Sequence, residues 1–188
     1  MNCEERYARA QKILHEKGLL DRLKKIGMPH VIGSCRMNMM AWNDLDIDVE
    51  NDGMCREKLY ALTAWILETF HPVWYEAKEE INGEGKTVWF HGFEAFIDGE
   101  KWNVDLWFFD RETIGKAERY CDSVKAQTEQ TPGAREAIIA IKQELIARGR
   151  YGFFDYASMD VYRAVLEQGV STTDELLEQY VRRENRID

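Results

Sequence analysis

Residues 31–50 read VIGSCRMNMMAWNDLDIDVE and join a short apolar run, a Gly-Ser turn and an alternating segment. In the alternating segment, apolar side chains fall on one face of a predicted strand and acids on the other, namely Asp44, Asp46 and Asp48. Like charges on one pleated face repel one another, and the sequence places no basic residue among them. This face is therefore either the solvated side of an edge strand or a set of carboxylate ligands for a divalent cation.

The turn that precedes the acids is formed by Gly33 and Ser34, which follow the apolar run Val31-Ile32. A strand that ends in Gly-Ser and opens a helix offers backbone N–H groups and a hydroxyl, which bind phosphates well. Arg36 lies two residues further on, where it is either available to a phosphate chain or an ordinary surface charge. Because Gly-Ser is a common dipeptide, this feature alone favours an ordinary turn.

A further acid, Asp105, lies within the otherwise apolar segment 102–109, WNVDLWFF, which predicts a strand. Its strand face also carries Asn103 and Trp107. A carboxylate between aromatic side chains is costly unless it is paired or binds a metal. Asp105 is therefore a candidate metal ligand, and Trp107 is a candidate to stack on a bound ring.

A hairpin signal, Asp98-Gly99-Glu100-Lys101, precedes this strand and follows another predicted strand over residues 87–97. A four-residue loop would place Glu94 opposite Asp105, whereas a two-residue loop would place Gly92 there. The sequence leaves both alternatives open, and with them the question of which further acids join the cluster.

The chain mixes helices and strands up to about residue 110 and is mostly helical afterwards. We therefore expect an α+β catalytic domain over residues 1–110 and a helical C-terminal region over 111–188 packed on it. The predicted helices span residues 3–26, 54–70, 134–148 and 157–168, with another that begins near Ser171.

The 188 residues include 25 Lys and Arg against 34 Asp and Glu, a net charge of −9. This charge disfavours a broad nucleic-acid-binding face and an anionic membrane surface as partners. No segment supplies the roughly 20 consecutive apolar residues of a membrane span, and the charged N-terminus has no signal-peptide core. The 4 cysteines show neither a CxxC pair nor metal-finger spacing, so we expect free thiols and a cytoplasmic location.

Together these features resemble the nucleotidyltransferase superfamily, which has the polymerase-beta-like fold and includes adenylyltransferases that act on antibiotics such as lincosamides. The family pattern is an apolar residue and Gly-Ser, a spacer, Asp-x-Asp on a strand, and a third acid on a later strand. Here Ile32-Gly33-Ser34 match the opening, Asp46 and Asp48 match the paired acids, and Asp105 matches the third. Asp44-Leu45-Asp46 fits the same pattern one step earlier, but we prefer Asp46 and Asp48 because an aspartate or serine-type residue often precedes the pair in members of this superfamily.

The resemblance covers about residues 28–109. It implies a nucleotidyltransferase-like mixed β-sheet flanked by helices, with a C-terminal helical extension. The tail from Ser158 to Leu176 is similar to uncharacterised relatives of the lincosamide-type enzymes. The implied activity is metal-dependent transfer of a nucleoside monophosphate from a nucleoside triphosphate, such as ATP, to a hydroxyl of a small-molecule acceptor. The alternative is a nucleotide- or metal-binding module that keeps the fold without turnover.

The resemblance also implies roles for individual residues. Asp46 and Asp48 would hold two Mg²⁺ ions, with Mn²⁺ as an alternative, and Asp105 would share one ion and take the acceptor proton. Two further groups would hold the triphosphate: the Gly33-Ser34 turn and Arg36. Because metal ions neutralise a triphosphate, the negative charge of the chain permits that ligand while it disfavours bare nucleic acid. The sequence leaves the nucleotide, the acceptor and the oligomeric state open.

Overall fold

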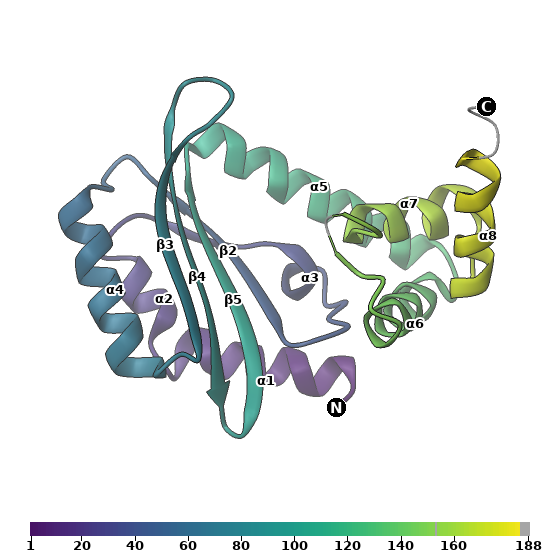
Figure 1. Cartoon of the computed structure of the whole chain (residues 1–188), viewed down its shortest axis with the longest axis horizontal. Helices are drawn as coiled ribbons and strands as arrows, with labels where there is room; N and C mark the ends of the chain where they lie inside the picture. Colours follow the sequence, from purple (N-terminus) through teal and green to yellow (C-terminus); the bar gives the residue numbers. More distant parts are fainter. Residues whose placement is uncertain (153, 185–188) are drawn as a thin grey trace. The chain divides into compact units, whose positions relative to one another are not determined.

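The alternating segment forms β2 (Asp44–Glu50), with the bounds predicted, and lies second in a five-stranded sheet of order β1-β2-β5-β4-β3. The computed structural model describes residues 1–152 and 154–184, with side chains up to residue 178 (Figure 1). β2 runs parallel to β5, and the other neighbouring strands pair antiparallel. The other strands are β1 (Pro29–Val31), β3 (Trp74–Ile81), β4 (Thr87–Ile97) and β5 (Glu100–Phe109).

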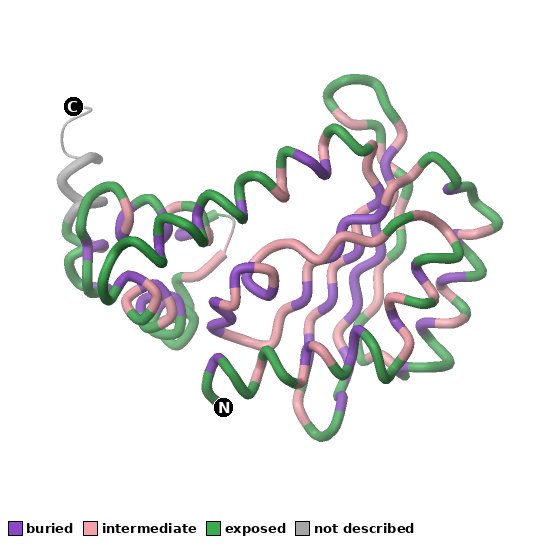
Figure 2. Tube along the Cα trace, turned by 180° about the vertical axis from the view of Figure 1, so that it is seen from behind, coloured by how far each residue is buried: buried purple, intermediate pink, exposed green. Residues whose placement is uncertain are grey.

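The apolar face of the sheet forms the core of the first part of the chain. The side chains of Leu45, Ile47 and Val49 on β2 are fully buried there, as are alternate residues of β5. Figure 1 shows the covering helices on one side of the sheet, and Figure 2 shows buried positions along the strands and along one side of these helices. They are α1 (Cys3–His15), α2 (Leu19–Leu23) and α4 (Arg56–Phe70).

The helix predicted over residues 3–26 is in fact two helices. Gly18 lies between α1 and α2 with a left-handed φ of 77°, which ends the first helix and redirects the chain. The expectation was wrong because the apolar stripe continues through the break and periodicity alone does not reveal it.

The hairpin between β4 and β5 has the shorter of the two loops considered. Ile97 pairs with Glu100, so only Asp98 and Gly99 form the turn, and Gly92 lies opposite Asp105. Asp98 and Gly99 have φ values of 51° and 82°, the left-handed pair that a two-residue hairpin turn requires. The residue opposite Asp105 therefore has no side chain of its own, and the rings of Phe90 and Trp74 lie over it instead.

The chain divides into two compact units, Met1–Cys121 and Asp122–Asp188. The division falls within α5 (Arg111–Gln130), whereas the boundary expected near residue 110 coincides with the beginning of that helix. Every helix over the described residues is too short or too polar to cross a membrane. The remaining helices are α6 (Ala134–Ala147), α7 (Ser158–Gln168) and α8 (Thr173–Glu184).

A buried histidine under α4 makes stability depend on pH. His91 is fully buried, its Nε2 lies 3.4 Å from Thr63 Oγ1, and burial lowers its pKa from 6.5 to about 4. The unfolded chain takes up a proton below about pH 6.5, whereas the folded chain does so only near pH 4. His91 should therefore contribute a fall of about 3 kcal/mol in the free energy of unfolding as the pH drops through this window, opposed by the gain from protonation of Asp48, whose pKa is raised to about 7.

Urea unfolding at pH 7 and pH 4.5 checks this expectation, with His91→Gln as the comparison. Between pH 7 and pH 4.5 the wild type should lose about 3 kcal/mol of stability relative to the variant, because only the wild type has an imidazole to protonate and Asp48 titrates in both proteins. An identical pH dependence in the wild type and the variant would assign the effect to other residues.

Candidate metal and nucleotide site

Three carboxylates from two neighbouring strands meet on the polar face of the sheet. The register places Asp46 beside Asp105 and Asp44 beside Asn103. One oxygen from each of Asp44, Asp46 and Asp105 lies within 4.8 Å of the others. Mg²⁺ binds oxygen ligands at about 2.0–2.1 Å, so oxygens at such mutual distances can share one ion after small side-chain movements. The three side chains therefore fit a hard divalent cation.

Asn103 holds two of these carboxylates side by side. Its Nδ2 donates hydrogen bonds to Asp44 Oδ1 at 2.9 Å and to Asp105 Oδ2 at 3.3 Å. Burial raises the pKa of Asp105, the negative charge of Glu76 raises it further, and the hydrogen bond from Asn103 opposes both. The protein thus keeps partly buried acids close together at an electrostatic cost that a bound cation would offset.

Asp48 is not brought into this group, although it shares the strand face. It pairs with His30 of β1 and Trp107 of β5. It therefore lies two residues further along β2 than Asp46, which is the residue that pairs with Asp105. Its side chain is only 2% exposed, and burial raises its pKa to about 7 although His30 lowers it. The structure thus groups Asp44, and not the preferred Asp48, with Asp46 and Asp105, and the identity of the metal-binding pair stays a prediction.

The Gly33 turn lies directly against this group. Gly33 has a left-handed φ of 61°, and a Cβ at this position would lie 2.1 Å from Asp46 Oδ2. The backbone N–H of Ile32 donates to the carbonyl oxygen of Asp46 at 3.0 Å, which fixes the turn to β2. Glycine is required here both for the backbone conformation and for the space beside the carboxylate.

Ser34 supplies a buried hydroxyl next to the same place, on the short helix α3 (Gly33–Arg36). The side chain is 6% exposed, and its Oγ has no hydrogen-bond partner within the described part of the chain. A buried hydroxyl without a partner is costly, so this atom fits a ligand that brings its own acceptor, such as a phosphate oxygen. The neighbouring Cys35 offers no nucleophile, because burial first and the charge of Asp46 second raise its pKa to about 12.

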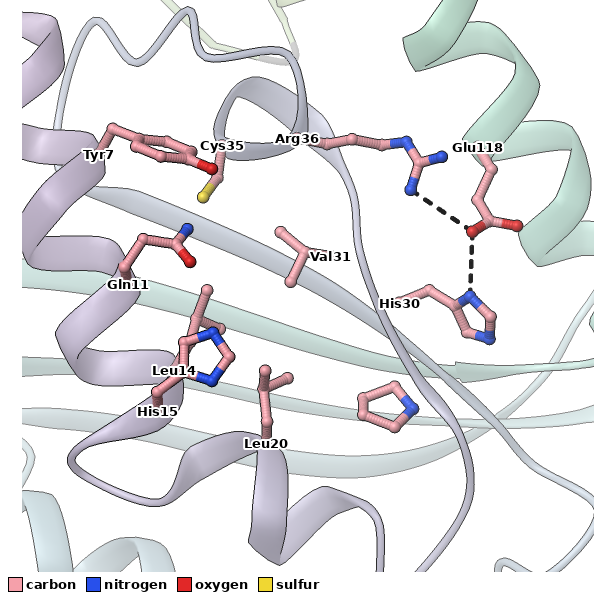
Figure 3. A pocket seen from close by; sticks show the side chains of 11 residues that line it. Tyr7, Gln11, Leu14, His15, Leu20, His30, Val31, Cys35, Arg36 and Glu118 are labelled. Carbon is pink, nitrogen blue, oxygen red and sulfur yellow. Dashed lines mark hydrogen bonds and ion pairs between the residues drawn. The ribbon is translucent and has the colours of Figure 1, made fainter.

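Arg36 makes an ion pair in the first unit. Figure 3 shows Arg36 and His30 both directed at Glu118, with Arg36 Nη1 3.4 Å and His30 Nδ1 3.0 Å from its Oε1. These residues line one end of a cavity of about 390 Å³, which Tyr7 and Gln11 of α1 line at the other. None of the three clustered aspartates lines this cavity. The role of Arg36 in holding phosphate stays a prediction.

The sequence analysis assigned no role to Asn103, whose side chain joins the two strands at the site. The signal was present, since Asn103 alternates with Asp105 on one strand face, but its partner Asp44 becomes apparent only once β2 and β5 are paired. The 4 cysteines, all within the described residues, form no disulfide in the structure.

Comparisons with known proteins relate the fold to one kind of enzyme. No protein-family model and no curated protein sequence matches the chain. Among solved structures, a cytoplasmic RNA terminal U-transferase superimposes with a TM-score of 0.56 at 15% identity, over 86% of this chain and 47% of that one. The Cid1 poly(U) polymerase gives 0.53 at 17% identity, over 87% of this chain and 52% of that one. The GLD-2–GLD-3 non-canonical poly(A) polymerase complex superimposes with a TM-score of 0.55 at 15% identity, over 90% of this chain and 55% of that one.

These similarities confirm the expected fold class, an α+β nucleotidyltransferase-type fold with a mixed sheet flanked by helices. The chain spans about half the length of these structures. The first of them is an RNA transferase and the other two are poly(U) and poly(A) polymerases, so they do not support the expectation that nucleic acid is a disfavoured partner. The likeness to lincosamide-type enzymes stays a prediction.

Proposed function

We propose that this chain is a metal-dependent nucleotidyltransferase that transfers a nucleoside monophosphate from a nucleoside triphosphate to a hydroxyl of a small-molecule acceptor. The observation that carries the proposal is the set of three carboxylates within 4.8 Å of one another, Asp44, Asp46 and Asp105. The adjoining glycine turn and the unpartnered hydroxyl of Ser34 support it, as does the fold shared with nucleotide polymerases.

In this proposal the three aspartates hold Mg²⁺, two ions in the full complex, with Mn²⁺ as an alternative. The bound ions supply charge neutralisation of the phosphates and stabilise the attacking and leaving oxygens. Ser34 Oγ donates a hydrogen bond to a phosphate oxygen, and the absent side chain of Gly33 lets the chain approach the carboxylate of Asp46. Arg36 is the proposed additional phosphate contact.

The reaction forms one bond and breaks one. The acceptor hydroxyl oxygen forms a bond to the α-phosphorus, and the bond from that phosphorus to the bridging oxygen of the β-phosphate breaks. Pyrophosphate leaves with the electron pair of the broken bond. We assign the hydroxyl proton to the carboxylate of Asp105, because it is the clustered acid on β5, on the side of β2 away from β1, whereas the Gly33 turn lies against Asp46.

The charge of the chain supports a small acceptor. The net charge is −9, and β3 adds Glu76 and Glu80 to the sheet face that carries the aspartates. A phosphate backbone would meet these acids without a neutralising metal. RNA is the second candidate acceptor, because the structural neighbours include an RNA transferase. A nucleoside triphosphate substrate and cysteines that form no disulfide among the described residues both fit the cytoplasmic location proposed from the sequence.

Pyrophosphate release by the full chain tests the proposal. Each nucleoside triphosphate is supplied with Mg²⁺ and either a collection of small hydroxyl compounds or a short RNA with a free 3′-hydroxyl. We expect metal-dependent release with one class of small compound and no extension of the RNA. Extension of the RNA would overturn the small-molecule acceptor. Metal-dependent nucleotide binding without release by any acceptor would support the non-catalytic binding module instead.

A further inference from the structure

The sheet face that carries the three aspartates continues as an aromatic surface formed by half-buried Trp107 of β5, buried Phe90 of β4 and exposed Trp74 of β3. The register pairs Phe90 with Trp107, and their ring centroids lie 4.6 Å apart. A Cβ on Gly92 would lie 2.5 Å from Phe90 Cζ and 3.0 Å from Trp74 Cη2, so both rings cover Gly92. Gly92 is the residue opposite Asp105, and the aromatic surface therefore begins beside the proposed site.

An ammonium group already occupies this surface. Lys78 Nζ lies 5.2 Å from the ring centroid of Phe90 and 5.9 Å from that of Trp107. It also lies 2.7 Å from Glu80 Oε1 and 3.6 Å from Glu76 Oε1. Two ring faces and two carboxylates around one nitrogen are the groups that recognise organic amines. The position is thus suited to a cation, and the protein supplies one from its own edge strand.

The ammonium of Lys78 is able to leave this position. Its side chain is 37% exposed, and β3 has a neighbour on only one side in the sheet. A lysine ammonium on a flexible four-carbon stem can turn to solvent at small cost. If it does so, two aromatic faces and the carboxylates of Glu76 and Glu80 are left to a ligand.

We propose that this position is the acceptor subsite, that the acceptor carries a protonated amine as well as its hydroxyl, and that Lys78 is a resident occupant which the acceptor displaces. This inference rests on the proposed function and names the chemical class of its acceptor. Trp107 lies two residues from Asp105 on β5, a separation of about 7 Å along a strand. A small molecule whose amine and hydroxyl are separated by a ring can therefore place its amine on the rings and its hydroxyl beside Asp105.

Calorimetric titration of the full chain with para-(aminomethyl)benzyl alcohol tests this inference. The neutral comparison is para-methylbenzyl alcohol, which has the same ring and hydroxyl. We expect the amine to bind at least about tenfold more tightly than the neutral compound. Equal binding of the two compounds, or no binding of the amine, would overturn the assignment of a cation subsite.

Variants separate the roles of the resident cation and of the rings. Lys78→Met should tighten amine binding about tenfold because the competing ammonium is gone, whereas Trp107→Leu should weaken it about tenfold and Trp107→Phe, which keeps a ring, less. Lys86→Met is the matched control, since Lys86 also pairs with two acids, Glu84 and Asp110, but lies over no ring. Unchanged or weaker amine binding in Lys78→Met would contradict the displacement.

Metal-dependent nucleotide binding by the wild type, measured in the same buffer, distinguishes failure of this inference from failure of the proposed function. If the amine binds no more tightly than the neutral compound while nucleotide binding is intact, the acceptor subsite alone is overturned. Absence of nucleotide binding contradicts the proposed function, whatever the amine titration shows.

Discussion

Asp46→Asn should lower metal-dependent pyrophosphate release by about a thousandfold, because a metal contributes several kcal/mol to stabilising the transition state of phosphoryl transfer. Asp46 lies between the other two carboxylates in the structure, next to Asp44 along β2 and beside Asp105 across the sheet. An amide in its place offers a neutral oxygen and a nitrogen that cannot bind Mg²⁺. The substitution changes the charge without changing the shape of the side chain.

Asp48→Asn is the matched control on the same strand. Asp48 is buried, its pKa is raised to about 7, and it lies outside the group of three carboxylates. An amide of the same shape should therefore leave most of the release intact. Circular dichroism and thermal unfolding establish that both variants are folded. If the two variants lost pyrophosphate release equally, or if Asp48→Asn lost more of it, the placement of the metal at Asp44 and Asp46 would be contradicted.

Gly33→Ala should destabilise the protein by more than about 2 kcal/mol and abolish metal-dependent nucleotide binding. Two effects add at this position. A left-handed φ of 61° disfavours any residue with a side chain, and the new methyl group would lie 2.1 Å from Asp46 Oδ2. Either the turn or the carboxylate has to move, and both belong to the proposed site. Urea unfolding and a nucleotide titration measure the two outcomes.

Gly18→Ala isolates the first of these effects. Gly18 has a similar φ of 77°, and a Cβ there would meet nothing within 4 Å, so the cost should be about 1 kcal/mol from the backbone alone. The difference between the two variants measures the contact with Asp46. If Gly33→Ala cost no more than Gly18→Ala and bound nucleotide normally, the turn would not lie against the carboxylate as described.

The sequence predicted the strands whose two faces differ in polarity. β2 was predicted with its observed bounds because apolar and acidic residues alternate through it without interruption. β3 spans Trp74–Ile81, and the apolar run Val73-Trp74-Tyr75 predicts only its beginning. The segment missed, EAKEEI, is rich in charges because β3 is an edge strand with solvent on one side. Its recognition depended on the pairing with β4, which the sequence does not display.

The sequence predicted that aspartates on two strands form the candidate site. Which of them lie together depends on the register of the sheet. All three acids alternate on one face, and the sequence analysis preferred Asp46 with Asp48 over Asp44 with Asp46. Only the pairing of β2 with β5 places Asp46 beside Asp105 and Asp48 beside Trp107. The position of Lys78 over Phe90 and Trp107 likewise joins three strands that are separate in the sequence. Pairwise distances across a sheet are long-range properties, and local patterns do not fix them.

A titration of Mn²⁺ followed by electron paramagnetic resonance tests the central claim most directly, because it reports the bound ion itself. It compares the wild type with two single substitutions at opposite ends of the alternating segment, Asp44→Asn and Asp48→Asn. The structure predicts that the wild type and Asp48→Asn bind Mn²⁺ with similar affinity and that Asp44→Asn binds it at least about tenfold more weakly. Normal binding by Asp44→Asn together with loss of binding by Asp48→Asn would contradict the site.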